Sequence, residues 1–163
     1  MVIGSTNTTM ICELKSIIQD FLIEGKNMAK VSVLSDKEEI VIAPSRFDIY
    51  FLDMNVFSET DIVPFSKQIK QIDDNAHLIY MSDKSEMARL SAKAKADYFI
   101  TTPFDKEEIF EILNEIKKEV KEDSVIIKVP GGERRIRTNH LNYIDIVKRC
   151  LCYHLKDGTM FDG

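Results

Sequence analysis

The sequence lacks the features of a secreted, membrane-spanning or zinc-binding protein. Its three cysteines are an odd number without a CxxC pair, so neither a disulfide framework nor a zinc site is expected. No apolar run approaches the roughly 20 residues that a membrane-spanning helix needs. The N-terminus also has no basic segment followed by an apolar core. We therefore expect a cytoplasmic protein with no membrane contact, whose thiols are reduced and mostly packed inside.

Enzyme motifs are absent too. The sequence contains no phosphate-cradling glycine loop, nucleophile elbow or metalloprotease helix, and it does not predict an enzyme.

Charge is unevenly distributed along the 163 residues: the net charge is -8 over residues 1–123 and +3 over residues 124–163, which together give -5. An acidic body and a basic tail indicate two modules, of which the second has the sign expected of a surface that contacts phosphates.

Five short β-prone runs alternate with stretches of helical period up to about residue 121. Strict alternation of strand and helix requires right-handed crossovers, and hence a parallel sheet with helices on both faces. The prediction is an α/β domain with a doubly wound five-stranded parallel sheet, whose working site lies beyond the carboxyl ends of the strands. The expected strands are Val2–Gly4, Lys30–Leu34, Asp48–Leu52, His77–Met81 and Tyr98–Thr101.

Local signals place three of the helices. Pro64 must lie in the first turn of its helix, which therefore begins near Thr60 or Asp61. Asp105 followed by Glu108 resembles a capping box at the start of the last helix. The first helix is expected to bury a stripe at helical spacing, formed by Met10, Leu14, Ile17 and Phe21.

The pattern after residue 121 changes to short strands separated by glycine-containing turns, typical of a small all-β module. Cys150 and Cys152 alternate along one strand and share a face, which favours core packing. About forty residues bury little apolar surface, so this module is expected to be too short to stand alone. We divide the chain into residues 1–121 and residues 122–163. The expected strands of the module are Ser124–Val129, Arg134–Arg137, Tyr143–Val147 and Leu151–Leu155.

Three strand ends carry residues of interest. Asp53 follows Asp-Ile-Tyr-Phe-Leu, Ser82 follows Ile-Tyr-Met, and Thr102-Pro103-Phe104 follows Ala-Asp-Tyr-Phe-Ile-Thr, with a cis-proline turn expected there. In this order they resemble the receiver domain of two-component response regulators, over about residues 1–121. The resemblance implies a flavodoxin-like fold and a carboxylate, Asp53, that accepts a phosphoryl group from a histidine kinase.

The tail carries a second resemblance. Val-Ile-Ile-Lys, a Gly-Gly turn, Arg-Ile-Arg, Leu-Asn-Tyr-Ile-Asp and Lys-Asp-Gly, in that order from Val125 to Gly158, are similar to the opening half of the LytTR DNA-binding domain. Receiver followed by LytTR implies a bacterial transcription regulator that binds DNA through a complete LytTR domain. The resemblance makes Lys148 and Arg149 the candidates for DNA contact, and a solvated turn is the alternative.

The receiver resemblance is incomplete at the residues that carry the chemistry. The family has two acids after the first strand and a lysine after the fifth; here the first strand runs into Ser5-Thr6-Asn7-Thr8, and Thr102 takes the place of the lysine. The backbone carbonyl of Asn55 could still face a metal. Since Mg²⁺ usually binds one or two carboxylates in near-octahedral geometry, we expect weak or absent Mg²⁺ binding and no other cofactor.

Simpler interpretations exist for the same residues. Asp53 could be a strand-end acid that accepts loop amides, and Ser82 a turn former. Phe99 resembles the aromatic switch of the family, but a buried strand aromatic is the alternative. The preferred function is a regulatory domain that is not phosphorylated efficiently. The alternatives are a weak phosphoryl acceptor at Asp53, or an interaction module that forms a homodimer, or binds another signalling protein, through the fourth helix, fifth strand and fifth helix.

Overall fold

The computed structural model describes residues 1–26, 29–42, 47–58, 60–122, 124–147, 150–156 and 158–162. The chain divides into two compact units, Met1–Ile112 and Leu113–Gly163. Helix α5 (Lys106–Glu122) runs through this division, and the domain boundary after residue 121 stays a prediction. Among the described residues, no helix combines the length and the apolar character required to span a membrane.

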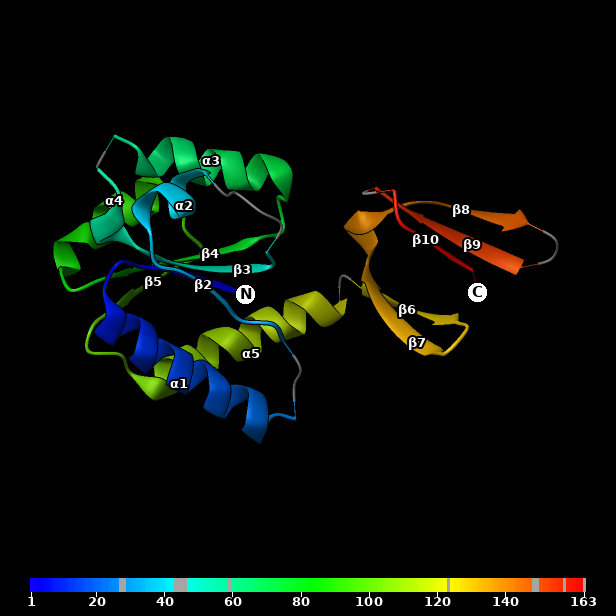
Figure 1. Cartoon of the computed structure of the whole chain (residues 1–163), viewed down its shortest axis with the longest axis horizontal. Helices are drawn as coiled ribbons and strands as arrows, with labels where there is room; N and C mark the ends of the chain where they lie inside the picture. The colour runs from blue at the N-terminus through cyan, green and yellow to red at the C-terminus, as the bar shows by residue number, and fades with distance from the viewer. Residues whose placement is uncertain are drawn as a thin grey trace. The chain divides into compact units, whose positions relative to one another are not determined.

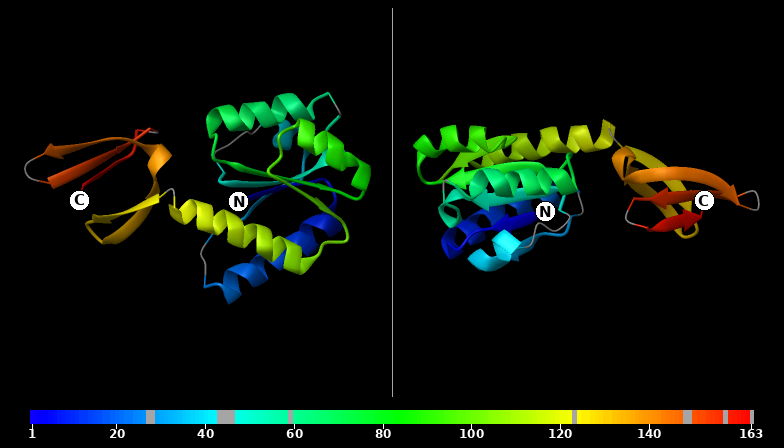
Figure 2. Two further views of the ribbon diagram at one scale, coloured as in Figure 1. Left: turned by 180° about the vertical axis from the view of Figure 1, so that it is seen from behind. Right: turned by 90° about the horizontal axis from the view of Figure 1, so that it is seen from above.

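The first unit confirms the predicted doubly wound sheet. Its five parallel strands are ordered β2-β1-β3-β4-β5 (Figure 1). Helices α1 and α5 lie on one face of the sheet, and α2, α3 and α4 lie on the other, as Figures 1 and 2 show from three directions. The strands are β1 (Val2–Gly4), β2 (Ser32–Leu34), β3 (Ile49–Asp53), β4 (His77–Ser82) and β5 (Tyr98–Thr101). The helices that precede α5 are α1 (Thr8–Glu24), α2 (Lys37–Ile42), α3 (Ile62–Ile72) and α4 (Ala88–Lys93).

Three strands of the first unit differ from the predicted boundaries. β4 ends at Ser82 rather than at Met81, and β3 begins at Ile49 rather than at Asp48. β2 begins at Ser32 rather than at Lys30, and its register with β1 runs from Val2↔Ser32 to Gly4↔Leu34. Before the strand, the Met1 N-terminus donates a hydrogen bond to the Lys30 carbonyl at 2.9 Å. β3 continues through Asp53, which pairs with Met81 of β4. The carboxylate at this edge is therefore the last residue of a paired strand rather than the first of a loop.

The central strands are apolar on both faces because helices cover both. All five residues of β3 are buried, as are five of the six in β4. Gly4 at the end of β1 packs closely, since a Cβ there would lie 3.1 Å from Leu52 Cδ2 and 3.3 Å from Ile40 Cγ2. The lack of a side chain at Gly4 therefore allows Leu52 of β3 and Ile40 of α2 to pack close to the end of β1.

Capping residues set the helix starts. Asn7 Oδ1 accepts the backbone N–H of Met10 at the start of α1. α3 begins at Ile62, so Pro64 does lie in the first turn; Asp61 occupies the N-cap position, although its side chain makes no capping hydrogen bond. Asp105 Oδ1 accepts the backbone N–H groups of the second and third residues of α5, at 2.9 and 3.3 Å. Of the predicted stripe of α1, Met10, Leu14 and Phe21 are buried, and Ile17 is only partly buried. Ile11 and Ile18, which were expected to widen the stripe, are buried too.

The part of the second unit that follows α5 is built from β-strands, as predicted. A hairpin pairs β6 (Ser124–Val129) with β7 (Gly132–Arg137), and a separate sheet has the order β10-β9-β8. Gly131 and Gly132 have φ values of +101° and +138° in the hairpin turn, a region that L side chains rarely adopt. Arg134 of the hairpin lies over the Phe161 ring of the sheet, with Cζ 4.8 Å from its centroid. The sheet strands are β8 (Leu141–Val147), β9 (Cys150–Leu155) and β10 (Met160–Asp162).

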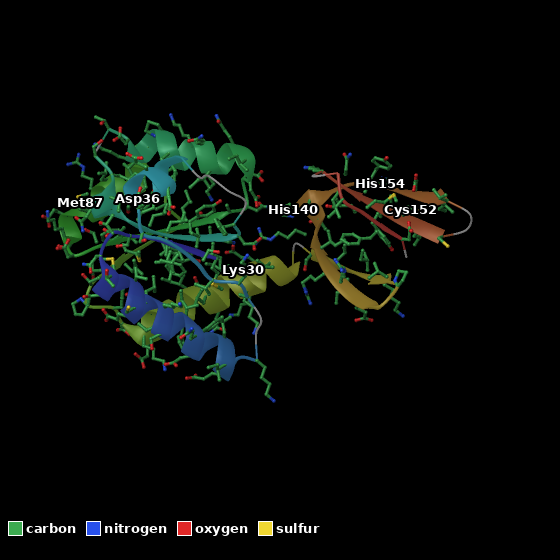
Figure 3. All side chains as sticks on the ribbon, viewed as in Figure 1. Lys30, Asp36, Met87, His140, Cys152 and His154 are labelled. Carbon is green, nitrogen blue, oxygen red and sulfur yellow. The ribbon has the colours of Figure 1, made fainter. Side chains whose placement is uncertain are left out.

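The prediction that the cysteines are mostly packed inside was wrong. Cys12 and Cys150 are exposed and only Cys152 is buried. Cys152 lies on β9, two residues before His154 (Figure 3), and the neighbouring strands place Asp145 and Asp162 opposite it. Burial, and secondly the hydrogen bond to Asp162, raise the pKa of the Cys152 thiol, which makes it a poor nucleophile.

Candidate functional site

Asp53 lies at the carboxyl edge of the sheet and is almost fully buried, with 1% of its surface exposed. Its Oδ2 accepts the Ser5 hydroxyl at 2.6 Å, and its Oδ1 accepts the Asn55 backbone N–H at 2.9 Å. The second bond caps the 3₁₀ turn η1 (Met54–Val56). Both carboxylate oxygens thus have donors from the protein. No ion pair of Asp53 exists among the described residues.

Ser5 connects Asp53 to the start of α1. Ser5 is fully buried, and its Oγ accepts the Asn7 backbone N–H at 3.0 Å while its hydroxyl donates to Asp53. Its own backbone N–H donates to the Leu34 carbonyl of β2 at 3.1 Å. The hydroxyl therefore has one donor and one acceptor role filled, and it occupies one side of the Asp53 carboxylate.

The end of β4 supplies Ser82 and Asp83. Ser82 is fully buried, and its Oγ accepts the backbone N–H of Lys84 at 3.1 Å. This is the hydrogen bond of a turn-forming serine. Asp83 is exposed and its Oδ1 accepts the side-chain amide of Asn55 at 3.2 Å. The loops that follow β3 and β4 are thereby joined beside Asp53.

Thr102 lies beside Ser82. Its backbone N–H donates to the Ser82 carbonyl at 3.1 Å, and the peptide bond to Pro103 is cis, as expected. Phe99 is half-buried and packs against the core on the α2, α3 and α4 side of the sheet. The candidate DNA contacts Lys148 and Arg149 lie outside the described residues.

Two features of the site were not foreseen from the sequence. One is the role of Ser5 as a hydrogen-bond donor to Asp53, and the other is the Asn55–Asp83 hydrogen bond. The available signal for Ser5 was a hydroxyl residue at the end of the strand adjacent to that of Asp53. It became meaningful only once the sheet order placed β1 next to β3.

The edge does not fit the Mg²⁺ ion that receiver domains use. Mg²⁺ prefers carboxylate oxygens and waters in an octahedron, whereas the end of β1 offers Ser5 and Thr6 instead of acids. The Asp53 oxygens already accept two hydrogen bonds. Within the described part of the chain, no group of three or more His, Cys, Asp or Glu side chains is arranged to hold a metal ion. We therefore derive no step through a metal.

Two hydrogen-bond networks stabilise the strands that carry the site. Asp97 Oδ2 accepts the Leu78 backbone N–H at 2.7 Å and Lys70 Nζ at 3.0 Å, which ties α3 to the starts of β4 and β5. Tyr80, on β4, is fully buried, and its hydroxyl lies 2.7 Å from Ser66 Oγ of α3. Ser66 donates to the Ile62 carbonyl, so Tyr80 donates to Ser66. Burial raises the pKa of Tyr80 to about 12.

Known structures share this arrangement of strands and helices. The response regulatory domain of protein mrkE from Klebsiella pneumoniae has a TM-score of 0.60 at 17% identity, covering 75% of this chain and 99% of that one. The receiver domain of AraT, a response regulator from Geobacillus stearothermophilus, has a TM-score of 0.57 at 18% identity, covering 74% and 95%. The chain has the fold of a receiver domain.

A longer match is the response regulator DrrB, a Thermotoga maritima OmpR/PhoB homolog. It has a TM-score of 0.57 at 16% identity and covers 90% of this chain and 66% of that one. No protein-family model and no curated protein matches the sequence. Identities of 16–18% establish the shared fold alone, so the chemistry of the site has to be argued from its own residues.

Proposed function

We propose that residues 1–121 are a receiver-type regulatory domain that works without efficient phosphorylation, and not an enzyme. The observation that carries the proposal is the state of Asp53. The sequence resemblance makes it the counterpart of the receiver acceptor, but it is buried and both its oxygens accept hydrogen bonds within the protein. An incoming phosphoryl donor would have to displace the Ser5 hydroxyl without a metal or a lysine to share its charge.

The proposal is tested by exposing the full chain to acetyl phosphate and Mg²⁺, followed by mass spectrometry of the intact protein. We expect no stable phosphoryl adduct and no binding of beryllofluoride. Asp53→Asn is the matched control, because it removes the acceptor and keeps the side-chain size. An adduct on the wild type that is absent from Asp53→Asn would overturn the proposal and favour a weak phosphoryl acceptor.

We propose further that regulation takes place through protein contacts. By analogy with receiver domains, the surface of α4, β5 and α5 would contact a second copy of the chain, with a histidine kinase or another signalling protein as a further partner. Dimerisation should then be independent of phosphate. Sedimentation at several protein concentrations should give the same association constant with and without acetyl phosphate. Dimers that form only after acetyl phosphate treatment would contradict this model.

Residues 122–163 are proposed to belong to a LytTR-type DNA-binding domain. The support is their sequence resemblance, the positive net charge of residues 124–163 and the β-strands that follow α5. Lys148 and Arg149 are the proposed phosphate contacts. Replacing both with alanine should weaken duplex binding equally for all sequences and reduce the slope of log K against log salt by about 2. A mobility-shift titration at several salt concentrations measures this, and an unchanged slope would exclude the two residues.

A further inference from the structure

The carboxyl edge of the first unit is crossed by a continuous chain of hydrogen bonds. It runs from Ser5 to Asp53 at 2.6 Å, from Asp53 to the Asn55 backbone at 2.9 Å, and from the Asn55 side chain to Asp83 at 3.2 Å. The backbone then leads to Ser82, whose carbonyl accepts a hydrogen bond at 3.1 Å from the residue after β5. The ends of β1, β3, β4 and β5 are thus linked through polar groups.

The link between Asn55 and Asp83 differs from the others because both side chains are exposed. A carboxylate only accepts hydrogen bonds, so the amide nitrogen of Asn55, and not its oxygen, must face Asp83. The same residue donates its backbone N–H to Asp53. Asn55 therefore donates to one carboxylate through its backbone and to another through its side chain. A movement of the β4–α4 loop that carries Asp83 would be transmitted through Asn55 to the hydrogen bond on Asp53.

We propose that the Asn55–Asp83 hydrogen bond is a strap that keeps the carboxyl edge closed over Asp53, and that Asp83 is a positioning residue of this site. The inference rests on the proposed function for its regulatory meaning: the strap holds the receiver fold in one state without a phosphoryl group on Asp53. Release of Asp83 would let the turn that follows β3 open. Its backbone N–H would then leave the Asp53 carboxylate.

The direct readout is hydrogen exchange of the Asn55 backbone amide, resolved by NMR in the full chain. Asp83→Ala removes the acceptor and should raise the exchange rate of this amide about three- to tenfold, the effect of losing one partly exposed hydrogen bond to a charged group. Asp83→Asn keeps an acceptor oxygen and should change the rate by less than about twofold. The Leu78 amide, which donates to Asp97, serves as the reference for global unfolding and should not change.

Asp74→Ala is the matched control, because it removes an exposed acid at the opposite end of the sheet. An Asn55 amide that exchanges at the wild-type rate in Asp83→Ala would overturn the strap, as would an equal acceleration in Asp74→Ala. The two proposals fail separately. Accelerated exchange in Asp83→Ala together with a wild-type phosphoryl adduct on Asp53 would refute the proposed function and leave the strap. No adduct and no acceleration would do the reverse.

Discussion

Ser5→Ala tests whether the hydroxyl is the group that makes a buried carboxylate tolerable at the end of β3. The substitution removes one oxygen atom. It leaves Asp53 Oδ2 without its 2.6 Å donor and the Asn7 N–H without its 3.0 Å acceptor. Asp53 is 1% exposed, so water cannot simply replace the lost donor. Net hydrogen bonds to charged groups contribute about 1.5–3 kcal/mol, and no cavity of consequence is created. We expect the free energy of unfolding to fall by about 2 kcal/mol.

Urea denaturation followed by far-ultraviolet circular dichroism measures this loss, because the helices that border the site dominate the signal. With a slope of about 2 kcal/mol per molar urea, the midpoint should fall by about 1 M. Ser91→Ala is the matched control: Ser91 is also buried, but its hydroxyl donates to the Ala88 carbonyl within its own helical turn. Removing such a local bond should cost less than about 1 kcal/mol.

The stability loss in Ser5→Ala should also depend on the charge of Asp53. In an Asp53→Asn background the acceptor is neutral, so Ser5→Ala should cost only about half as much as in the wild type. Such a double-mutant cycle isolates the pair from the rest of the site. A Ser5→Ala loss no larger than that of Ser91→Ala, or an undiminished loss in the Asp53→Asn background, would refute the account of the site given above.

Three other predictions concern the hydrogen bonds that stabilise β4 and the acid and lysine that the site lacks. Tyr80→Phe should lower the free energy of unfolding by about 1 kcal/mol near neutral pH. An unfolded tyrosine has a pKa near 10, whereas the pKa of Tyr80 is about 12, so wild-type stability should fall as the pH rises through this interval. Urea midpoints at pH 9 and 11 should therefore show that the stability difference between the two proteins shrinks or reverses. Asp97→Ala leaves the Leu78 N–H without its acceptor and should cost about 1–2 kcal/mol in the same assay, while Asp97→Asn, which keeps an acceptor oxygen, should cost less than half of that. Ser5→Asp combined with Thr102→Lys supplies an acid and the cation that the receiver resemblance requires, and should give a Mg²⁺-dependent phosphoryl adduct by mass spectrometry. An adduct without Mg²⁺, or none at all, would contradict that reasoning.

The sequence was sufficient to predict the order of the elements and most of their bounds. Apolar runs of strand length that alternate with helical periodicity leave few architectures other than a parallel sheet covered on both faces. Val2–Gly4 and Tyr98–Thr101 were predicted to the residue. Cys12 and Cys150 were predicted to be packed inside but are exposed. The residue type alone does not reveal which face of a helix or strand is buried by neighbouring elements.

The position of Asp53 at the working edge was likewise readable, since a strand-end acid in this fold must lie at the carboxyl edge. What the acid contacts was decided by tertiary structure alone. Ser5 and Asp53 are 48 positions apart in the chain, and they meet because β1 lies beside β3 in the order β2-β1-β3-β4-β5. Alternating strands and helices determine that a sheet forms, but the order of its strands depends on which faces the helices cover. A side-chain pairing across two strand ends is therefore a property of the folded sheet and not of either segment.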